Sequence, residues 1–399
     1  MENNYWALAT LCVLCSCTQS EVRENSLKEI PVEINQSIPF QFFDYTNAAT
    51  ISHYDIAEET TFPLSEIAEE VTSIELEFTD KSIINPHSIR RVIIYDNNVI
   101  IAEGERILVF DVSGKFVRSF ASKGQGPREF ISYIQHITID EKNKVLYASD
   151  GRKIISFDLN GKYIDEFNID SKETSLSSEI KDMYFSNNNL FIVSSQVINN
   201  KGKKTLHKSM VFTMNRDFQL IDSCIIWNLL LDQSIFFNSN FVNYVFGIDT
   251  TVYVYYPEIL SLSIRKEYSQ LLTDERIFYD TLYRFENNQL IPELKLKFTK
   301  NGKEWGGIKD IQITSIYRSS RFIFIEYHNA LQKTMISYCY DLKTGKHYDC
   351  VDKMFTISKW IKLIPDKHNP ELIYYWKTNF KPDDLFEPNP TLYIGRLKN

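Results

Sequence analysis

One short segment combines glycines and basic residues in a way that could bind an anion. Gly124-Gln125-Gly126-Pro127-Arg128-Glu129-Phe130 brings backbone amides close to the positive charges of Lys123 and Arg128. The segment lacks the Lys-Ser/Thr ending of a P-loop and precedes no predicted helix. We therefore expect a structural turn, with the glycines at positive φ, Pro127 fixing the bend and Glu129 accepting backbone hydrogen bonds. A phosphate-binding loop is the alternative.

The seven histidines show no spacing that is typical of a metal site. They lie at positions 53, 87, 136, 207, 328, 347 and 368, without an HExxH motif or a close pair. His136 begins a predicted inner strand, where it could line one mouth of a central channel with Arg90, Lys123 and Arg128. These four residues are the candidate ligand-binding residues, and ordinary polar rim residues are the alternative.

Motifs for catalysis are missing from the sequence. No Gly-x-Ser-x-Gly element occurs, and the Asp and Glu residues form no acid–base motif. We assign no catalytic residue and no metal ligand, and we expect no cofactor.

The N-terminus carries an export pattern. The apolar run Tyr5 to Leu14 is shorter than the roughly 20 residues that span a bilayer, so residues 1–16 are predicted to be a cleaved signal peptide. Leu14-Cys15-Ser16-Cys17 resembles a bacterial lipobox, which implies that Cys17 carries a lipid. Residues 17–50 are mixed and polar, and we expect a tether there. For the apolar N-terminal run, the alternative to a signal peptide is a buried strand or helix.

Composition favours a β protein that does not bind nucleic acid. The 399 residues carry 44 Lys and Arg against 52 Asp and Glu, a net charge of −8 that is unsuited to neutralising phosphates. The 23 Tyr and 27 Phe outnumber the 13 Gly and 12 Pro, a balance that favours strands over helical bundles.

An internal repeat organises the chain. Asn98–Ala102, Ile107–Asp111 and a Ser113-Gly114 turn recur as Val145–Ala148, Ile154–Asp158 and an Asn160-Gly161 turn. The equivalent positions of six copies are Phe110, Phe157, Phe212, Phe285, Tyr340 and Ile394, which gives units of propeller-blade size. The longest spacing indicates an insertion around Pro257 to Asp280.

The blades are expected to have four strands each. Further apolar stretches, at Ile89–Tyr95, His136–Ile139 and Asp310–Ile316, precede the repeated pairs and suit innermost strands. The last unit ends at Asn399 without room for a fourth strand, whereas residues 71–78 alternate and belong to no unit. We infer that residues 71–78 close the ring as the outer strand of the last blade. Two stacked β-sandwiches are the alternative.

A disulfide between Cys339 and Cys350 depends on the turn between them. A two-residue turn would place the thiols opposite each other, whereas a four-residue loop would pair Cys339 with Tyr348. Gly345 comes one residue later after Asp341 than the glycine does in the first two copies, so the longer loop is favoured.

Three stretches resemble the six-bladed β-propeller lipoproteins of Bacteroidales-type bacteria, which are similar in style to NHL-repeat propellers. They are Pro63–Val71, Gly124–Phe130, and Asp280–Arg284 with Pro292. The resemblance implies an all-β propeller at residues 51–399, lipid-anchored in the cell envelope at the outer membrane.

The expected function is binding or scaffolding of an envelope protein or glycan by a monomer, through loops at one face. The alternative is a metal-dependent lactonase- or lyase-like enzyme, because such propellers assemble channel ligands from different blades.

Overall fold

The computed structural model describes most of the chain after residue 48. The described ranges are 49–54, 64–126, 128–168, 179–200, 204–231, 245–256, 280–300, 303–304, 311–329, 334–353, 363–378 and 388–399. The signal peptide, residues 17–48 of the expected tether with Cys17, Pro127 and most of the expected insertion at 257–280 lie outside the described residues. The tether was expected to extend to residue 50, but residues 49 and 50 belong to a strand.

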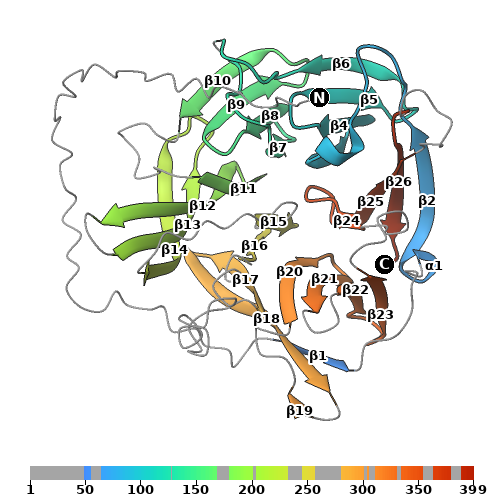
Figure 1. Cartoon of the computed structure of the whole chain (residues 1–399), viewed down its shortest axis with the longest axis vertical. Helices are drawn as coiled ribbons and strands as arrows, with labels where there is room; N and C mark the ends of the chain where they lie inside the picture. Colours follow the sequence, from blue (N-terminus) through green and yellow to red (C-terminus); the bar gives the residue numbers. More distant parts are fainter. Residues whose placement is uncertain are drawn as a thin grey trace, which may run out of the picture. The chain divides into compact units, whose positions relative to one another are not determined.

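Six sheets form the blades of a β-propeller, and each blade has four antiparallel strands, as predicted (Figure 1). Blade 1 contains β3 (Arg91–Tyr95), β4 (Asn98–Ala102), β5 (Ile107–Asp111) and β6 (Phe116–Phe120). Blade 2 contains β7 (His136–Asp140), β8 (Val145–Ser149), β9 (Lys153–Asp158) and β10 (Tyr163–Asn168). Blade 3 contains β11 (Glu179–Ser186), β12 (Asn189–Asn200), β13 (Lys204–Met214) and β14 (Leu220–Leu231).

The second half of the chain builds the other three blades. Blade 4 contains β15 (Val245–Ile248), β16 (Thr251–Val254), β17 (Thr281–Glu286) and β18 (Gln289–Lys300), and β19 (Lys303–Glu304) pairs with β18. Blade 5 contains β20 (Ile311–Arg318), β21 (Phe322–Asn329), β22 (Thr334–Asp341) and β23 (His347–Lys353). Blade 6 contains β24 (Ile364–Pro365), β25 (Leu372–Lys377), β26 (Thr391–Leu397) and the N-terminal β2 (Ala68–Glu75).

The ring closes as the sequence predicts. After the short helix α1 (Leu64–Ile67), β2 pairs antiparallel with β26 and forms the outer strand of blade 6. The strand begins and ends three residues earlier than expected. Beyond Glu75 the chain turns to blade 1, where Glu77 bonds to the backbone of Gly114 and Phe116.

One strand was not predicted. β1 (Ala49–Tyr54) pairs parallel with β18, residue by residue from Ala49 with Leu294 to Tyr54 with Thr299. Blade 4 thereby gains an added strand on its outer edge.

Turns of the repeated Asp-x-x-Gly type have the expected geometry. Gly114 and Gly161 have φ of +88° and +85°, and the carboxylates of Asp111 and Asp158 accept backbone amides within their turns. A Cβ at Gly114 would collide with the carbonyl of Glu75, so this turn also needs glycine to approach the closing strand.

The longer loop after Asp341 is confirmed. The amide of Asp341 donates to the carbonyl of Lys346, and Cys339 pairs with Tyr348. Cys339 is buried with a free thiol.

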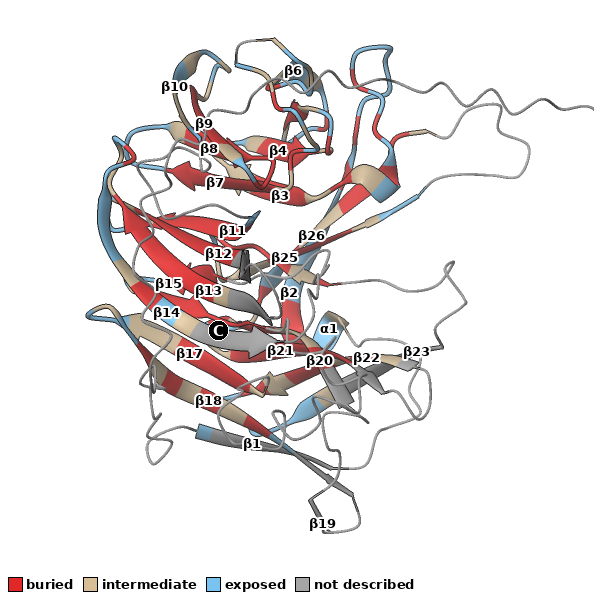
Figure 2. Ribbon diagram, turned by 60° about the vertical axis from the view of Figure 1, so that its left-hand side comes forward, coloured by how far each residue is buried: buried red, intermediate tan, exposed pale blue. Residues whose placement is uncertain are grey.

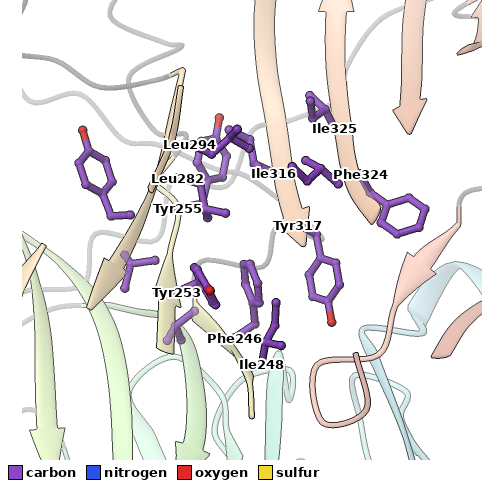
Figure 3. Packing of buried hydrophobic residues seen from close by; sticks show 14 of the residues in the cluster. Phe246, Ile248, Tyr253, Tyr255, Leu282, Leu294, Ile316, Tyr317, Phe324 and Ile325 are labelled. Carbon is purple, nitrogen blue, oxygen red and sulfur yellow. The ribbon is translucent and has the colours of Figure 1, made fainter. Parts of the chain in front are cut away.

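The core lies between neighbouring blades. Inner and middle strands are buried, whereas exposed residues concentrate on outer strands and turns (Figure 2). Between blades 4 and 5, the ring centroids of Phe246 and Tyr317 are 4.5 Å apart, and Ile316 and Phe324 belong to the same cluster (Figure 3). In the described ranges, no helix has the length and apolarity needed to span a membrane.

Candidate functional site

The turn between β24 and β25 reaches the centre of the ring. Its residues Asp366, Lys367 and His368 contact four other blades. The Asp366 side chain accepts the amide of Ile94 in blade 1 at 3.4 Å, and its carbonyl accepts the hydroxyl of Tyr317 in blade 5 at 2.6 Å. The turn therefore occupies the central channel with residues of the chain itself.

Asp182 is the counterpart of this turn on the opposite side of the ring. Its Oδ1 accepts Nζ of Lys367 at 2.7 Å, and the same ammonium donates to the carbonyl of Met183 at 3.1 Å. Its Oδ2 accepts the amide of Val245 in blade 4 at 3.3 Å. Asp182 and Lys367 are both buried, so a buried ion pair joins blades 3 and 6 across the channel.

Histidines complete the group from blades 2 and 6. Nδ1 of His136 lies 3.5 Å from Oδ1 of Asp182. Nε2 of His368 lies within hydrogen-bond distance, 3.2 Å, of the hydroxyl of Thr138. We call Arg91, His136, Asp182, Asp366, Lys367 and His368 the central cluster.

Burial and charge pairing set the ionisation of this cluster. Burial alone would raise the pKa of Asp182, but the ammonium of Lys367, together with the nearby His136 and Arg91, holds it well below its usual range. Burial raises the pKa of Asp366 to about 6, although the hydrogen bonds that its carboxylate accepts from backbone amides act to lower it. Burial lowers the pKa of His136 and outweighs the attraction of Asp182, so its imidazole is neutral at pH 7.

The arrangement does not resemble a metal site. Within the described ranges, no three His, Cys, Asp or Glu side chains are grouped so that they could hold a metal ion. Around Asp182 the neighbours are instead the cations of Lys367 and Arg91 together with His136. The central cluster therefore joins blades through the ion pair and the hydrogen bonds that the carboxylate of Asp182 accepts.

The four residues singled out from sequence lie toward one end of the strands, but not in one group. His136 is buried in the central cluster. Arg90 immediately precedes β3, and its amide donates to the carbonyl of Ala102. Lys123 lies over the ring of Tyr133 at 3.8 Å, and Arg128 over the ring of Tyr163 at 4.5 Å, in the connection between β6 and β7.

The glycine-rich segment is a structural turn that is held by its own carboxylate. Glu129 accepts the amide of Gly126 at 2.6 Å and the hydroxyl of Ser122 at 3.3 Å, as expected. The expectation of positive φ at the glycines is wrong, because in this segment only Arg128, at +69°, has it among the described residues. Gly124 and Gly126 instead leave room for the Glu129 carboxylate, which a Cβ at either position would displace.

Sequence reasoning missed Asp182, Asp366 and Lys367. The available signal was the polar run Asp366-Lys367-His368-Asn369, placed where the first hairpin of the last blade must turn at the channel. Asp182 has no comparable local signal.

The two faces of the ring differ in the length of their connections. Strands one and two, and strands three and four, are joined by short turns such as 96–97, 159–162 and 187–188. We call the face that carries them the turn face. The other connections start and end on the opposite face, the loop face, and include the longest: 121–135, 169–178, 232–244, 255–280, 354–363 and 378–390. Arg90, Lys123 and Arg128 all belong to connections of the loop face.

Comparison with solved structures finds matches at low identity. A Bacteroides fragilis protein described as "Putative exported protein" matches with a TM-score of 0.58 and 15% identity, over 88% of this chain and 100% of that chain. The Pan2 WD40 domain of Neurospora crassa matches with a TM-score of 0.41 and 11% identity, over 81% and 80%. A Bacteroides caccae protein of unknown function gives 0.36 and 9%, over 71% and 84%.

A search of curated proteins finds no match. A family model described as "Domain of unknown function (DUF4934)" matches residues 48–380. The match begins one residue before β1 and extends into the connection between β25 and β26. Because it covers nearly the whole ring, the added strand β1 included, the chain belongs to the DUF4934 family.

Proposed function

We propose that this propeller is an exported, lipid-anchored binding module that recognises an envelope protein or glycan through its loop face. The observation that carries the proposal is the concentration of long connections on that face. In rigid scaffolds, long loops at one end of the strands are the usual place for recognition.

The filled channel supports the same assignment. Asp366, Lys367 and Asp182 bond to one another or to neighbouring blades at the centre of the ring, so their polar groups serve the fold. Recognition then falls to the periphery of the loop face, where Ile131 is 72% exposed and Tyr133 is 46% exposed. Lys123 and Arg128 lie in the same connection and supply positive charge.

Export and anchoring are supported by the lipobox-like sequence at Cys17 and by the description of the Bacteroides fragilis neighbour. Membrane fractionation of cells that express the parent and the Cys17→Ala variant tests the anchor. We expect the variant to leave the membrane fraction, and equal retention of both would refute the lipid attachment.

Binding is tested with matched surface variants. The purified protein is applied to a glycan array and to a bacterial envelope extract, followed by mass spectrometry of retained proteins. Ile131→Asp on the loop face should weaken any binding found by about tenfold or more, since an exposed apolar anchor is lost.

Leu342→Asp is the matched control, because Leu342 is 38% exposed in the β22–β23 turn of the turn face. It should leave binding unchanged. Equal loss in both variants, or loss only in the control, would overturn the assignment of the loop face.

A further inference from the structure

The outer strand of each blade presents a backbone edge that its own sheet does not pair. Such edges attract other strands unless charges or a cover protect them. All six outer strands contain charged residues: Glu69, Glu70 and Glu75 in β2, Arg118 in β6, Asp165 and Glu166 in β10, Asp222 in β14, Glu293, Lys295, Lys297 and Lys300 in β18, and Asp349, Asp352 and Lys353 in β23.

The edge of β18 is, in addition, covered by the chain itself. β18 carries β1 along six residue pairs, in parallel orientation. Blade 4 therefore shows that an outer edge of this ring accepts an added strand.

The edge of β14 has one charged residue, Asp222, near its start, and among the described residues no strand pairs with its outer side. Its half Cys224–Leu231 reads Cys-Ile-Ile-Trp-Asn-Leu-Leu-Leu and contains no charged residue. In the sheet order β14 is terminal and pairs with β13 alone. Ile221 and Ile225 are 55% and 39% exposed, so apolar side chains accompany the edge.

The usable part of this edge can be delimited. The carbonyl of Ser223 already accepts Nδ2 of Asn288 from blade 4, at 2.9 Å. Pairing with a further strand is therefore expected from Cys224 onward, over the uncharged half.

We infer that β14 is an interface between two copies of this chain, which pair edge to edge in antiparallel orientation. Antiparallel pairing of identical edges gives a closed twofold dimer in which each copy satisfies the other. Because Cys224–Leu231 contains no charged residue, no register of pairing over this half places like charges opposite each other. In contrast, if β6 paired with β6 of a second copy about its middle residue, Arg118 would face Arg118. In the same arrangement of β10, Asp165 would face Glu166.

A lipid surface is a poorer occupant of the same patch. Unpaired backbone amides and carbonyls of a sheet edge are costly in hydrocarbon, and a second strand satisfies them. The pairing would join two four-stranded blades into one continuous sheet.

Sedimentation equilibrium of the full chain with Cys17→Ser, which prevents lipid attachment, tests the inference. We expect a mass of twice the 46.8 kDa of one chain. Ile225→Lys should raise the dissociation constant by at least about tenfold, equivalent to 1.4 kcal/mol, because it places positive charges within the paired edge. Leu342→Lys is the control of similar exposure on the turn face and should remain dimeric.

Hydrogen exchange provides a readout that needs no variant. In the unsubstituted edge, amides of residues 224–231 should exchange more slowly as the protein concentration rises from roughly 1 to 100 µM, a range that populates dimers of micromolar affinity. A monomer throughout this range, unchanged exchange at 224–231, or a dimer that survives in a folded Ile225→Lys variant would overturn the inference.

Discussion

Replacing Lys367 by methionine should destabilise the ring because it removes the counter-ion of a buried carboxylate. Nζ of Lys367 lies 2.7 Å from Oδ1 of Asp182 and 3.1 Å from the carbonyl of Met183, and methionine keeps the length of the side chain but none of these bonds. Removing one partner of a buried ion pair costs about 3–5 kcal/mol.

The expected change in melting temperature follows from the size of the domain. A domain of about 350 residues unfolds with an entropy of about 0.7 kcal/mol per kelvin, so this loss lowers the Tm by about 4–7 °C. Differential scanning calorimetry at pH 7 measures it directly.

Two further variants separate the loss of the pair from other effects. Asp182→Asn added to Lys367→Met removes the unpaired charge and should recover part of the Tm. Lys144→Met breaks an exposed pair, 3.4 Å from Asp96, and should lower the Tm by less than about 1.5 °C, since exposed pairs contribute at most about 1 kcal/mol. The reasoning fails if Lys367→Met is as stable as Lys144→Met, or if the double variant is less stable than Lys367→Met.

Three other outcomes follow from the same contacts. Gly124→Ala should destabilise the protein by about 0.5–1.5 kcal/mol in chemical denaturation, because a Cβ there displaces the Glu129 carboxylate from its hydrogen bonds, and the same change should cost much less in a Glu129→Ala background, where these bonds are already lost. Burial raises the pKa of Asp366 to about 6, so between pH 6 and its unfolded pKa this carboxyl is protonated in the folded state but ionised in the unfolded state. The contribution of Asp366 to stability therefore increases as the pH falls from 7.5 to 5. The Tm of Asp366→Asn relative to the parent should accordingly be higher at pH 7.5 than at pH 5, and a constant difference would contradict the shifted pKa. Deleting residues 68–75 should abolish cooperative unfolding or lower the Tm far more than a point variant does, whereas an unchanged Tm would rule out β2 as the closing strand.

The ring was predictable because its signals are local. Each blade repeats an apolar pair of strands, blades 1, 2 and 5 add a glycine turn, and the closing strand is indicated by the alternating residues 71–78, which belong to no unit. Such patterns are set by the strand period and turn chemistry of neighbouring residues.

The centre was not predictable in the same way. Asp182 and Lys367 meet only because blades 3 and 6 face each other across the ring, and nothing near either residue in the sequence reports this. β1 escaped notice for a similar reason: its partner strand Gln289–Lys300 is remote in sequence, and parallel pairing leaves no hairpin signal.

The glycine-rich segment shows a different limit. Its residue types indicated a turn correctly, but the role of Gly124 and Gly126 depends on where the Glu129 side chain lies. Sequence reasoning assigned the glycines by their backbone freedom, whereas the structure uses their lack of a side chain.

The closing strand also determines the order in which the protein can mature. β2 is synthesised before blades 1 to 5, whereas its partner β26 and the counter-ion Lys367 are synthesised after them. Until β26 and Lys367 have been made, β2 has no partner strand and the carboxylate of Asp182 lacks its ammonium partner, so the ring is completed only after the last blade has been synthesised. A chain that stops before residue 364 lacks both β26, the partner of the closing strand, and Lys367, the counter-ion of Asp182, and we expect quality-control proteases to remove it.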